Sequence, residues 1–311
     1  MSTTRSRLID RSFPPEILLE VVQRLPFDKN LVPQLASIHP YIQAILVAYE
    51  TSVTKAFVQK NLYHALTDFP TSRPTYVWLS RCVQQYDVVD DVMEVLTSEH
   101  NCFAVEKHNV SLVNTGLYLL YRLQEFEAPD SKIAFIKALP RDPLTAVFLA
   151  IHYSTLTARY ESQGIINQQT YGRFLDANRL ELRNDIEFAF SEGVLDLGAK
   201  FVADVLLRAE GAEPALLCIY HDHSIHDWVM QRADANADPD FQPPITQGPH
   251  RDPETKARSL YTTLLERLAE LYGCPLQEVI SKVEEEVELP DHDLAWLNLH
   301  GKARVIGETV F

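Results

Sequence analysis

Residues 13–62 read FPPEILLEVVQRLPFDKNLVPQLASIHPYIQAILVAYETSVTKAFVQKNL and carry the clearest helical pattern of the chain. Pro14 and Pro15 stand directly before an aliphatic run, and the first turn of a helix tolerates proline because no needed N–H donor is lost there. Glu16 follows at a place where the helix dipole favours negative charge. The stretch therefore predicts a helix that stops at Pro26, with an apolar stripe formed by Ile17, Leu18, Val21, Val22 and Leu25.

Two further helices are predicted in the same stretch. One begins near Asn30, with Leu31, Leu35 and Ile38 on one side, and Pro40 interrupts it. The next continues a helical face through Ile42, Ile45, Leu46, Tyr49, Val53 and Phe57. Three helices in about fifty residues have difficulty burying their apolar faces alone. We therefore expect a partner surface or the rest of the chain to cover them.

This stretch resembles an F-box, particularly the divergent form found in fungal proteins. The family opens with Leu-Pro-x-Glu-Ile/Leu-Leu, runs through an aliphatic helix to a Leu-Pro, and follows with two more helices. The family's later Val-Cys-Arg-x-Trp element has no close match in residues 37–42, which contain neither arginine nor tryptophan. The positions that fit the opening pattern are Phe13, Pro14, Glu16, Ile17, Leu18, Val22, Leu25 and Pro26.

The resemblance implies a function for the module. It implies that these eight residues dock onto the adaptor subunit of an SCF (cullin-RING) ubiquitin ligase, and through the adaptor onto the cullin. The rest of the chain would then bring an unknown protein substrate. Helix-in-groove recognition explains how a partner covers such an apolar stripe. The alternative is that Ile17, Leu18, Val22 and Leu25 are core positions of one continuous helical domain, and periodicity does not separate the two.

The rest of the chain is also predicted to be helical. Only 10 glycines are present, where an average composition gives about 20, and that scarcity argues against a turn-dense all-β architecture. Helically spaced apolar residues recur, as in Val113, Leu117, Leu120 and Leu123. The segment Asp68–Pro74 contains two prolines and marks a boundary. We predict an all-α protein with a three-helix F-box-like module at residues 13–62 and a larger helical domain at residues 71–311.

Residues 232–256 interrupt the helical pattern. This segment contains five prolines and few large apolar residues. A long loop inside a compact domain is usually functional or disordered, and the composition here is that of a flexible linker. We therefore predict a mobile, proline-rich loop.

Charge and composition limit the classes of partner. Residues 1–70 carry 7 basic and 6 acidic side chains, whereas residues 71–311 carry 21 basic and 37 acidic ones. The larger part would repel nucleic-acid phosphates and anionic lipid, so we expect neither nucleic acid nor a membrane as partner. No apolar run approaches the ~18 residues needed to span a bilayer, and no secretory segment is visible at the start, which predicts a cytoplasmic or nuclear location.

Motifs of common enzymes are not found. The sequence contains no GxxxxGKS/T, GxGxxG, GxSxG or HExxH. The four cysteines form no CxxC pair, so neither a zinc site nor a disulfide framework is indicated. The densest polar cluster, residues 221–227, holds three histidines and two aspartates, but no further ligand is indicated, so a solvated helix end is favoured over a metal site.

We therefore expect a non-catalytic interaction protein with no cofactor and no metal. An alternative from another class is an enzyme or small-molecule binder whose pocket lies among the C-terminal helices, where local motifs do not show it. A further alternative is a structural helical protein with a degenerate F-box.

Overall fold

The computed structural model describes residues 14–28, 30–160, 166, 180–220 and 259–309. All regular secondary structure in these residues is helical, which confirms the prediction of an all-α protein for the described part of the chain. The chain divides into two compact units, Met1–Val88 and Val89–Phe311. None of the described helices is long and apolar enough to cross a membrane. The predicted loop at 232–256 lies outside the described residues.

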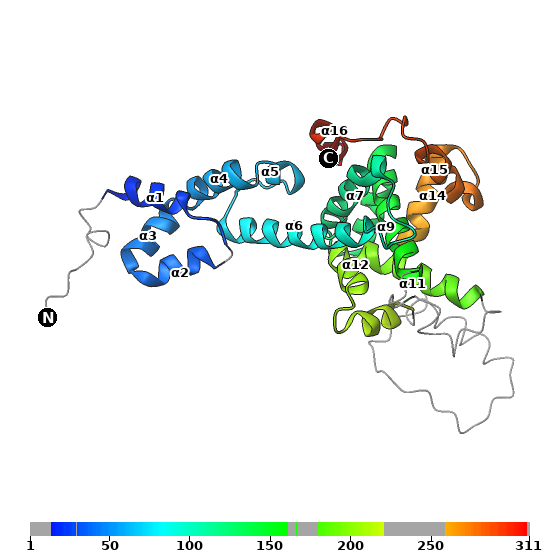
Figure 1. Cartoon of the computed structure of the whole chain (residues 1–311), viewed down its shortest axis with the longest axis horizontal. Helices are drawn as coiled ribbons and strands as arrows, with labels where there is room; N and C mark the ends of the chain where they lie inside the picture. Colours follow the sequence, from blue (N-terminus) through cyan, green and yellow to red (C-terminus); the bar gives the residue numbers. More distant parts are fainter. Residues whose placement is uncertain (1–13, 29, 161–165, 167–179, 221–258, 310–311) are drawn as a thin grey trace, which may run out of the picture. The chain divides into compact units, whose positions relative to one another are not determined.

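The first unit is a small helical module. A helix boundary at Tyr49 differs from the prediction. The apolar face that was expected to continue through Tyr49 belongs to two helices, because the backbone leaves the helical conformation there (φ −110°, ψ 17°). Apolar residues keep helical spacing on both sides of this break, so the sequence does not show it. The helices are α1 (Pro15–Arg24), α2 (Leu31–Ile38), α3 (Pro40–Ala48), α4 (Glu50–Asn61), α5 (Ala65–Asp68) and the first part of α6 (Tyr76–Leu96) (Figure 1).

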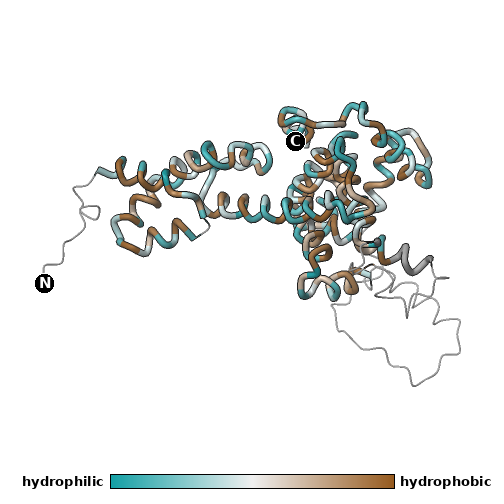
Figure 2. Tube along the Cα trace, viewed as in Figure 1, coloured by the Kyte–Doolittle hydropathy of each residue, from teal (hydrophilic) through white to brown (hydrophobic). Residues whose placement is uncertain are grey.

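Apolar residues from five of these helices form the core of the first unit. The rings of Phe27 and Phe57 lie 5.2 Å apart and close one side of it. In Figure 2, hydrophobic residues alternate with hydrophilic ones along the helices, as amphipathic packing requires. The buried members are Leu18, Leu19, Val22, Ile42, Ile45, Leu46, Val53, Phe57, Val58, Ala65, Phe69, Leu79 and Cys82.

Hydrogen bonds attach the start of α6 to the helices before it. Tyr86 donates its hydroxyl proton to the buried carboxylate of Asp68 (2.7 Å), and the indole N–H of Trp78 donates to the carbonyl of Phe69 (3.2 Å). The backbone N–H of Tyr76 donates to Glu50 on α4 (2.9 Å). The first unit therefore continues past residues 68–74, where the sequence places the boundary, and ends within α6.

The second unit is built around the contact between α7 (Val110–Leu123) and α9 (Arg141–Tyr160), which lie side by side (Figure 1). The remaining helices pack around this pair. They are α8 (Pro129–Ala138), α11 (Leu180–Leu197), α12 (Ala199–Leu206), α14 (Leu260–Tyr272), α15 (Val279–Val287) and α16 (Leu299–Gly307), with 3-10 turns η2 (Lys107–Asn109) and η4 (Leu276–Glu278).

Small residues let α7 and α9 approach closely. A Cβ atom added to Gly116 of α7 would overlap the backbone carbonyl of Ala146 and would lie 2.9 Å from the Cβ of Ala150, both on α9. The alanines are fully buried. Any larger side chain at Gly116 therefore has to push the two helices apart.

Buried polar side chains connect the surrounding helices. Glu192 of α11 accepts hydrogen bonds from the backbone N–H groups of Leu260 (2.8 Å) and Tyr261 (2.9 Å) and from the hydroxyl of Ser259 (2.9 Å). These N–H groups belong to the first turn of α14 and have no partner within their own helix. A carboxylate is favoured there by the helix dipole as well. Glu192 thus fixes where α14 begins.

The α7–α9 contact can be tested by replacing Gly116 with alanine. In an ordinary helix this change stabilises by up to about 1 kcal/mol, but overpacking costs ~1 to 3 kcal/mol, so G116A should destabilise the second unit. Gly307→Ala is a matched control, since a Cβ there meets nothing within 4 Å. Urea unfolding should show a lower midpoint for G116A and an equal or higher one for G307A. Equal midpoints for G116A and the unmodified chain would contradict the close contact.

Candidate functional site

The structure separates the predicted adaptor-binding residues into a buried and an exposed set. Leu18 and Val22 are 6% and 2% exposed and belong to the core of the first unit. Leu25 is half-buried. Phe13 lies outside the described residues. The exposed set, which is accessible to a partner, consists of Pro14, Glu16, Ile17 and Pro26.

Helix α1 also presents an apolar residue that the family pattern does not include. Ile17 and Val21 are 48% and 46% exposed and lie one turn apart on the same face of the helix. Sequence periodicity places Val21 in the apolar stripe but does not indicate that it faces outward. Ile17 and Val21 together are called the α1 surface below.

Other parts of the first unit leave apolar side chains in solvent too. Helix α2 is rich in aliphatic residues, yet none of its residues is buried. Ile38 at its end and Val47 on α3 are both exposed. Exposed apolar patches mark interaction sites in folded proteins. The module therefore has a core of its own and apolar surface left over.

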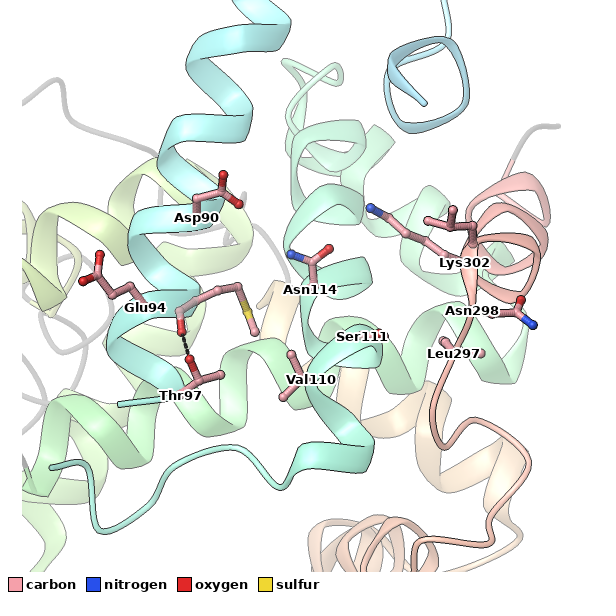
Figure 3. A pocket seen from close by; sticks show the side chains of 11 residues that line it. Asp90, Glu94, Thr97, Val110, Ser111, Asn114, Leu297, Asn298 and Lys302 are labelled. Atoms are coloured by element: carbon pink, nitrogen blue, oxygen red, sulfur yellow. Dashed lines mark hydrogen bonds between the residues drawn. The ribbon is translucent and has the colours of Figure 1, made fainter. Parts of the chain in front are cut away.

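A pocket of about 350 Å³ lies in the second unit, between the end of α6, the start of α7 and the residues that lead into α16 (Figure 3). Met93, Val110 and Leu297 supply apolar walls. Asp90 and Lys302 project into the space between the helices from opposite sides (Figure 3). None of the described lining residues carries an imidazole or a thiol. The lining therefore combines apolar walls with carboxylate, ammonium, hydroxyl and amide groups.

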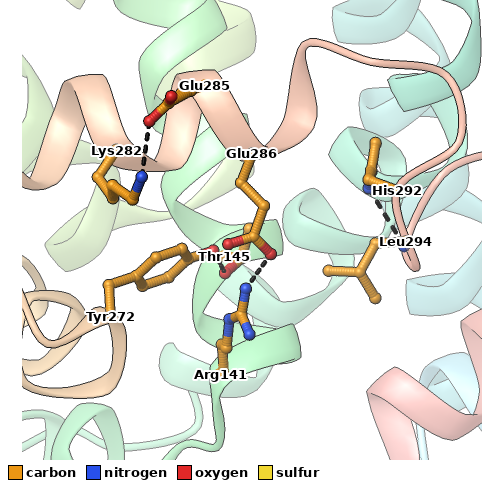
Figure 4. A network of polar contacts seen from close by, with 8 residues as sticks. All are labelled: Arg141, Thr145, Tyr272, Lys282, Glu285, Glu286, His292 and Leu294. Carbon is orange, nitrogen blue, oxygen red and sulfur yellow. Dashed lines mark hydrogen bonds and ion pairs between the residues drawn. The ribbon is translucent and has the colours of Figure 1, made fainter.

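Two histidines and an asparagine hold the chain next to this pocket. His108 Nε2 and Asn109 Nδ2 each lie 2.9 Å from the carbonyl oxygen of Val287, the last residue of α15. His292 Nε2 lies 2.8 Å from Asn109 Oδ1, and its Nδ1 accepts the backbone N–H of Leu294 (3.2 Å, Figure 4). These two contacts use both ring nitrogens of a neutral imidazole, with the proton on Nε2.

The environment of His292 favours that neutral form. Burial, and then the neighbouring His108, lower the pKa of His292 below its ordinary value of 6.5, while the carboxylates of Glu286, Asp293 and Asp291 act in the opposite direction. Protonation of Nδ1 would also set two N–H donors against each other at Leu294. The network therefore depends on a neutral His292.

A second polar network joins α9, α14 and α15 (Figure 4). Arg141 pairs with Glu286, and its guanidinium lies 4.5 Å from the centre of the Tyr272 ring. The hydroxyls of Thr145 and Tyr272 lie 3.0 Å apart. Partly exposed ion pairs of this kind contribute little individually, and their role here is to connect three helices.

No cluster of three or more metal-ligating side chains occurs in the described ranges. The histidine- and aspartate-rich residues 221–227 lie outside those ranges.

Comparison with family models, with curated proteins and with solved structures finds no match to this chain. The function is therefore argued from the chain's own residues.

The His292 network predicts a pH dependence of stability. The unfolded chain takes up a proton at the ordinary pKa of 6.5 and the folded chain only at a lower one, so this contribution to stability is complete above pH 6.5 and is lost as the pH falls through the folded pKa. Between pH 7.5 and 5.5, the free energy of unfolding of the His292→Gln variant should fall less than that of the unmodified chain. Urea unfolding at each pH measures it. The exposed His300, changed to glutamine, is the control and should behave as the unmodified chain. Identical pH profiles for all three proteins would refute the prediction.

Proposed function

We propose that this chain is a non-catalytic substrate receptor of the F-box type, which docks on the adaptor of an SCF (cullin-RING) ubiquitin ligase through its first unit. The second unit then brings a protein for ubiquitination. One observation carries the proposal: α1, which bears the motif residues, keeps the α1 surface exposed while Leu18 and Val22 anchor the helix to the module. A cytoplasmic or nuclear location is part of the proposal.

The energetics favour docking of this kind. Burying an aliphatic side chain contributes ~1.5 to 3 kcal/mol, so two side chains that are about half exposed leave roughly 2 kcal/mol for a partner to recover. Lys60 of α4 lies 3.4 Å from the carbonyl oxygen of Gln23 near the end of α1, which helps to fix the helix on the module. A helix held in place before binding loses less entropy when it docks.

The pocket of the second unit is the observation that favours a different class, a small-molecule binder or an enzyme. Its lining joins apolar walls to a few charged and hydrogen-bonding side chains, as small-ligand and peptide sites do. We therefore assign the pocket to binding. The third possibility, a structural protein with a degenerate F-box, differs from our proposal in predicting no adaptor binding.

The proposal is tested with the double variant Ile17→Ser, Val21→Ser. Both side chains are about half exposed, so the module should stay folded while it loses the apolar contact with the adaptor. A loss of about 2 kcal/mol corresponds to roughly thirtyfold weaker binding. Binding of purified adaptor is measured by calorimetry, with circular dichroism to check folding.

A matched control removes two exposed aliphatic residues of the same unit outside the motif, Leu66→Ser with Val77→Ser. It should bind adaptor as the unmodified chain does. Aspartate at Leu18 and Val22 would instead unfold the module, because both are core positions. The proposal fails if the unmodified chain does not bind adaptor at micromolar concentration, or if the Ile17/Val21 variant binds as tightly as the control.

A further inference from the structure

The pocket between α6, α7 and α16 combines apolar walls with charged groups of both signs. We propose that it binds a peptide segment of the client protein in which a lysine or arginine stands next to an aliphatic residue. This inference rests on the proposed function, because it names the kind of segment that the substrate receptor would recognise.

The volume and the walls suit aliphatic side chains. About 350 Å³ lies at the lower end of the range of ligand pockets and has room for one or two side chains. Met93 is a flexible, polarizable residue that adapts to different apolar groups. Val110 and Leu297 complete the apolar part. A purely polar ligand would leave these walls without contacts.

An exposed tryptophan lies next to the pocket in the chain. Trp296 is 61% exposed and directly precedes Leu297, and Leu299, which lines the pocket, is 52% exposed. Trp296 adopts a positive φ of 52°, and its backbone N–H donates to the backbone carbonyl of His108 (2.8 Å). Tryptophan is among the residues most often found at the centres of binding energy in interfaces. These residues extend the apolar surface beyond the pocket, as a peptide longer than one residue requires.

The carboxylates that line the pocket favour a positively charged ligand. Asp90 and Glu94 lie one turn apart on α6 and line the pocket. The surrounding part of the chain is acidic, with 37 acidic and 21 basic residues from Thr71 onward. Both the local and the overall charge therefore favour a cationic side chain and disfavour phosphate groups of a nucleic acid.

Hydrogen-bond donors on the side of the pocket opposite α6 can bind the backbone of a peptide. Lys302 has its ammonium nitrogen 3.9 Å from the centre of the Tyr118 ring and lines the pocket together with Asn114. In Figure 3, both side chains point towards α6. They can donate to peptide carbonyl groups while a basic side chain of the same peptide pairs with Asp90 and Glu94. A small free cation would make no contact with the apolar walls.

The wall that contains Lys302 is held in place before binding. The His108, Asn109 and His292 network fixes the chain just before Trp296, and Asn298 accepts the backbone N–H of Gly301 (2.9 Å) at the start of α16. Preorganisation of this kind lowers the entropic cost of binding.

The proposal is tested with the full chain on an array of nine-residue peptides, in which the three central positions vary within a glycine–serine background. We expect selection of peptides with lysine or arginine next to leucine, isoleucine or valine. Selection of acidic peptides, or no selection, would overturn the proposal.

Charge variants then test the location. The double variant D90N/E94Q should bind the best labelled peptide about three- to tenfold more weakly, as expected for the loss of two exposed charge pairs. D87N/D91N removes the same two charges from exposed positions of the same helix that do not line the pocket, and should stay within twofold of the unmodified chain. Equal weakening by both pairs would mean that long-range charge alone attracts the peptide, and would overturn the assignment to this pocket.

Adaptor binding measured on the same proteins separates the two proposals. D90N/E94Q should bind adaptor normally. Adaptor binding without peptide selection would overturn only the peptide site. Peptide selection without adaptor binding would overturn the ligase assignment and would support the peptide site.

Discussion

The close contact between α7 and α9 organises the second unit. Gly116 leaves no side chain between the helices, and the fully buried Ala146 and Ala150 occupy the facing turns. Interiors are packed as densely as organic crystals, so this distance determines where the surrounding helices fit. The buried Glu192 reaches the start of α14 only when α11 and α14 stand in those positions. A change of distance at Gly116 would therefore affect polar contacts elsewhere in the unit.

The same helix pair positions the candidate peptide site. Val110 and Asn114 on the first turns of α7 line the pocket, and the preceding η2 turn carries His108 and Asn109. These two side chains bind the end of α15, Asn109 also binds His292, and the backbone carbonyl of His108 accepts the backbone N–H of Trp296. The η2 turn thus binds the segment that leads into the opposite wall, and α7, which follows it, carries part of the pocket. The first unit differs from the second in its surface. Its core is complete, yet aliphatic residues of α1 and α2 stay exposed.

Apolar spacing predicted the helical class and the helices α1 and α2, since periodicity is a local property of the sequence. It merged α3 and α4 into one helix and did not predict α5 or α6. It did not predict which side of α1 faces the core: Ile17 and Leu18 are neighbours of similar chemistry, and only their tertiary contacts make one exposed and the other buried. The break at Tyr49 was invisible because apolar spacing continues through it. The pocket has no local signature either, because Asp90 and Lys302 lie far apart in the sequence and meet only through folding.

We propose that the exposed residues of α1 connect the chain to a ubiquitin ligase. The most direct measurement is affinity purification of the tagged full chain from eukaryotic cells, followed by mass spectrometry, beside the Ile17→Ser, Val21→Ser variant at equal expression. The adaptor and cullin subunits should co-purify with the unmodified chain and be depleted with the variant. Absence of both subunits from the unmodified chain, or equal recovery with the variant, would contradict it.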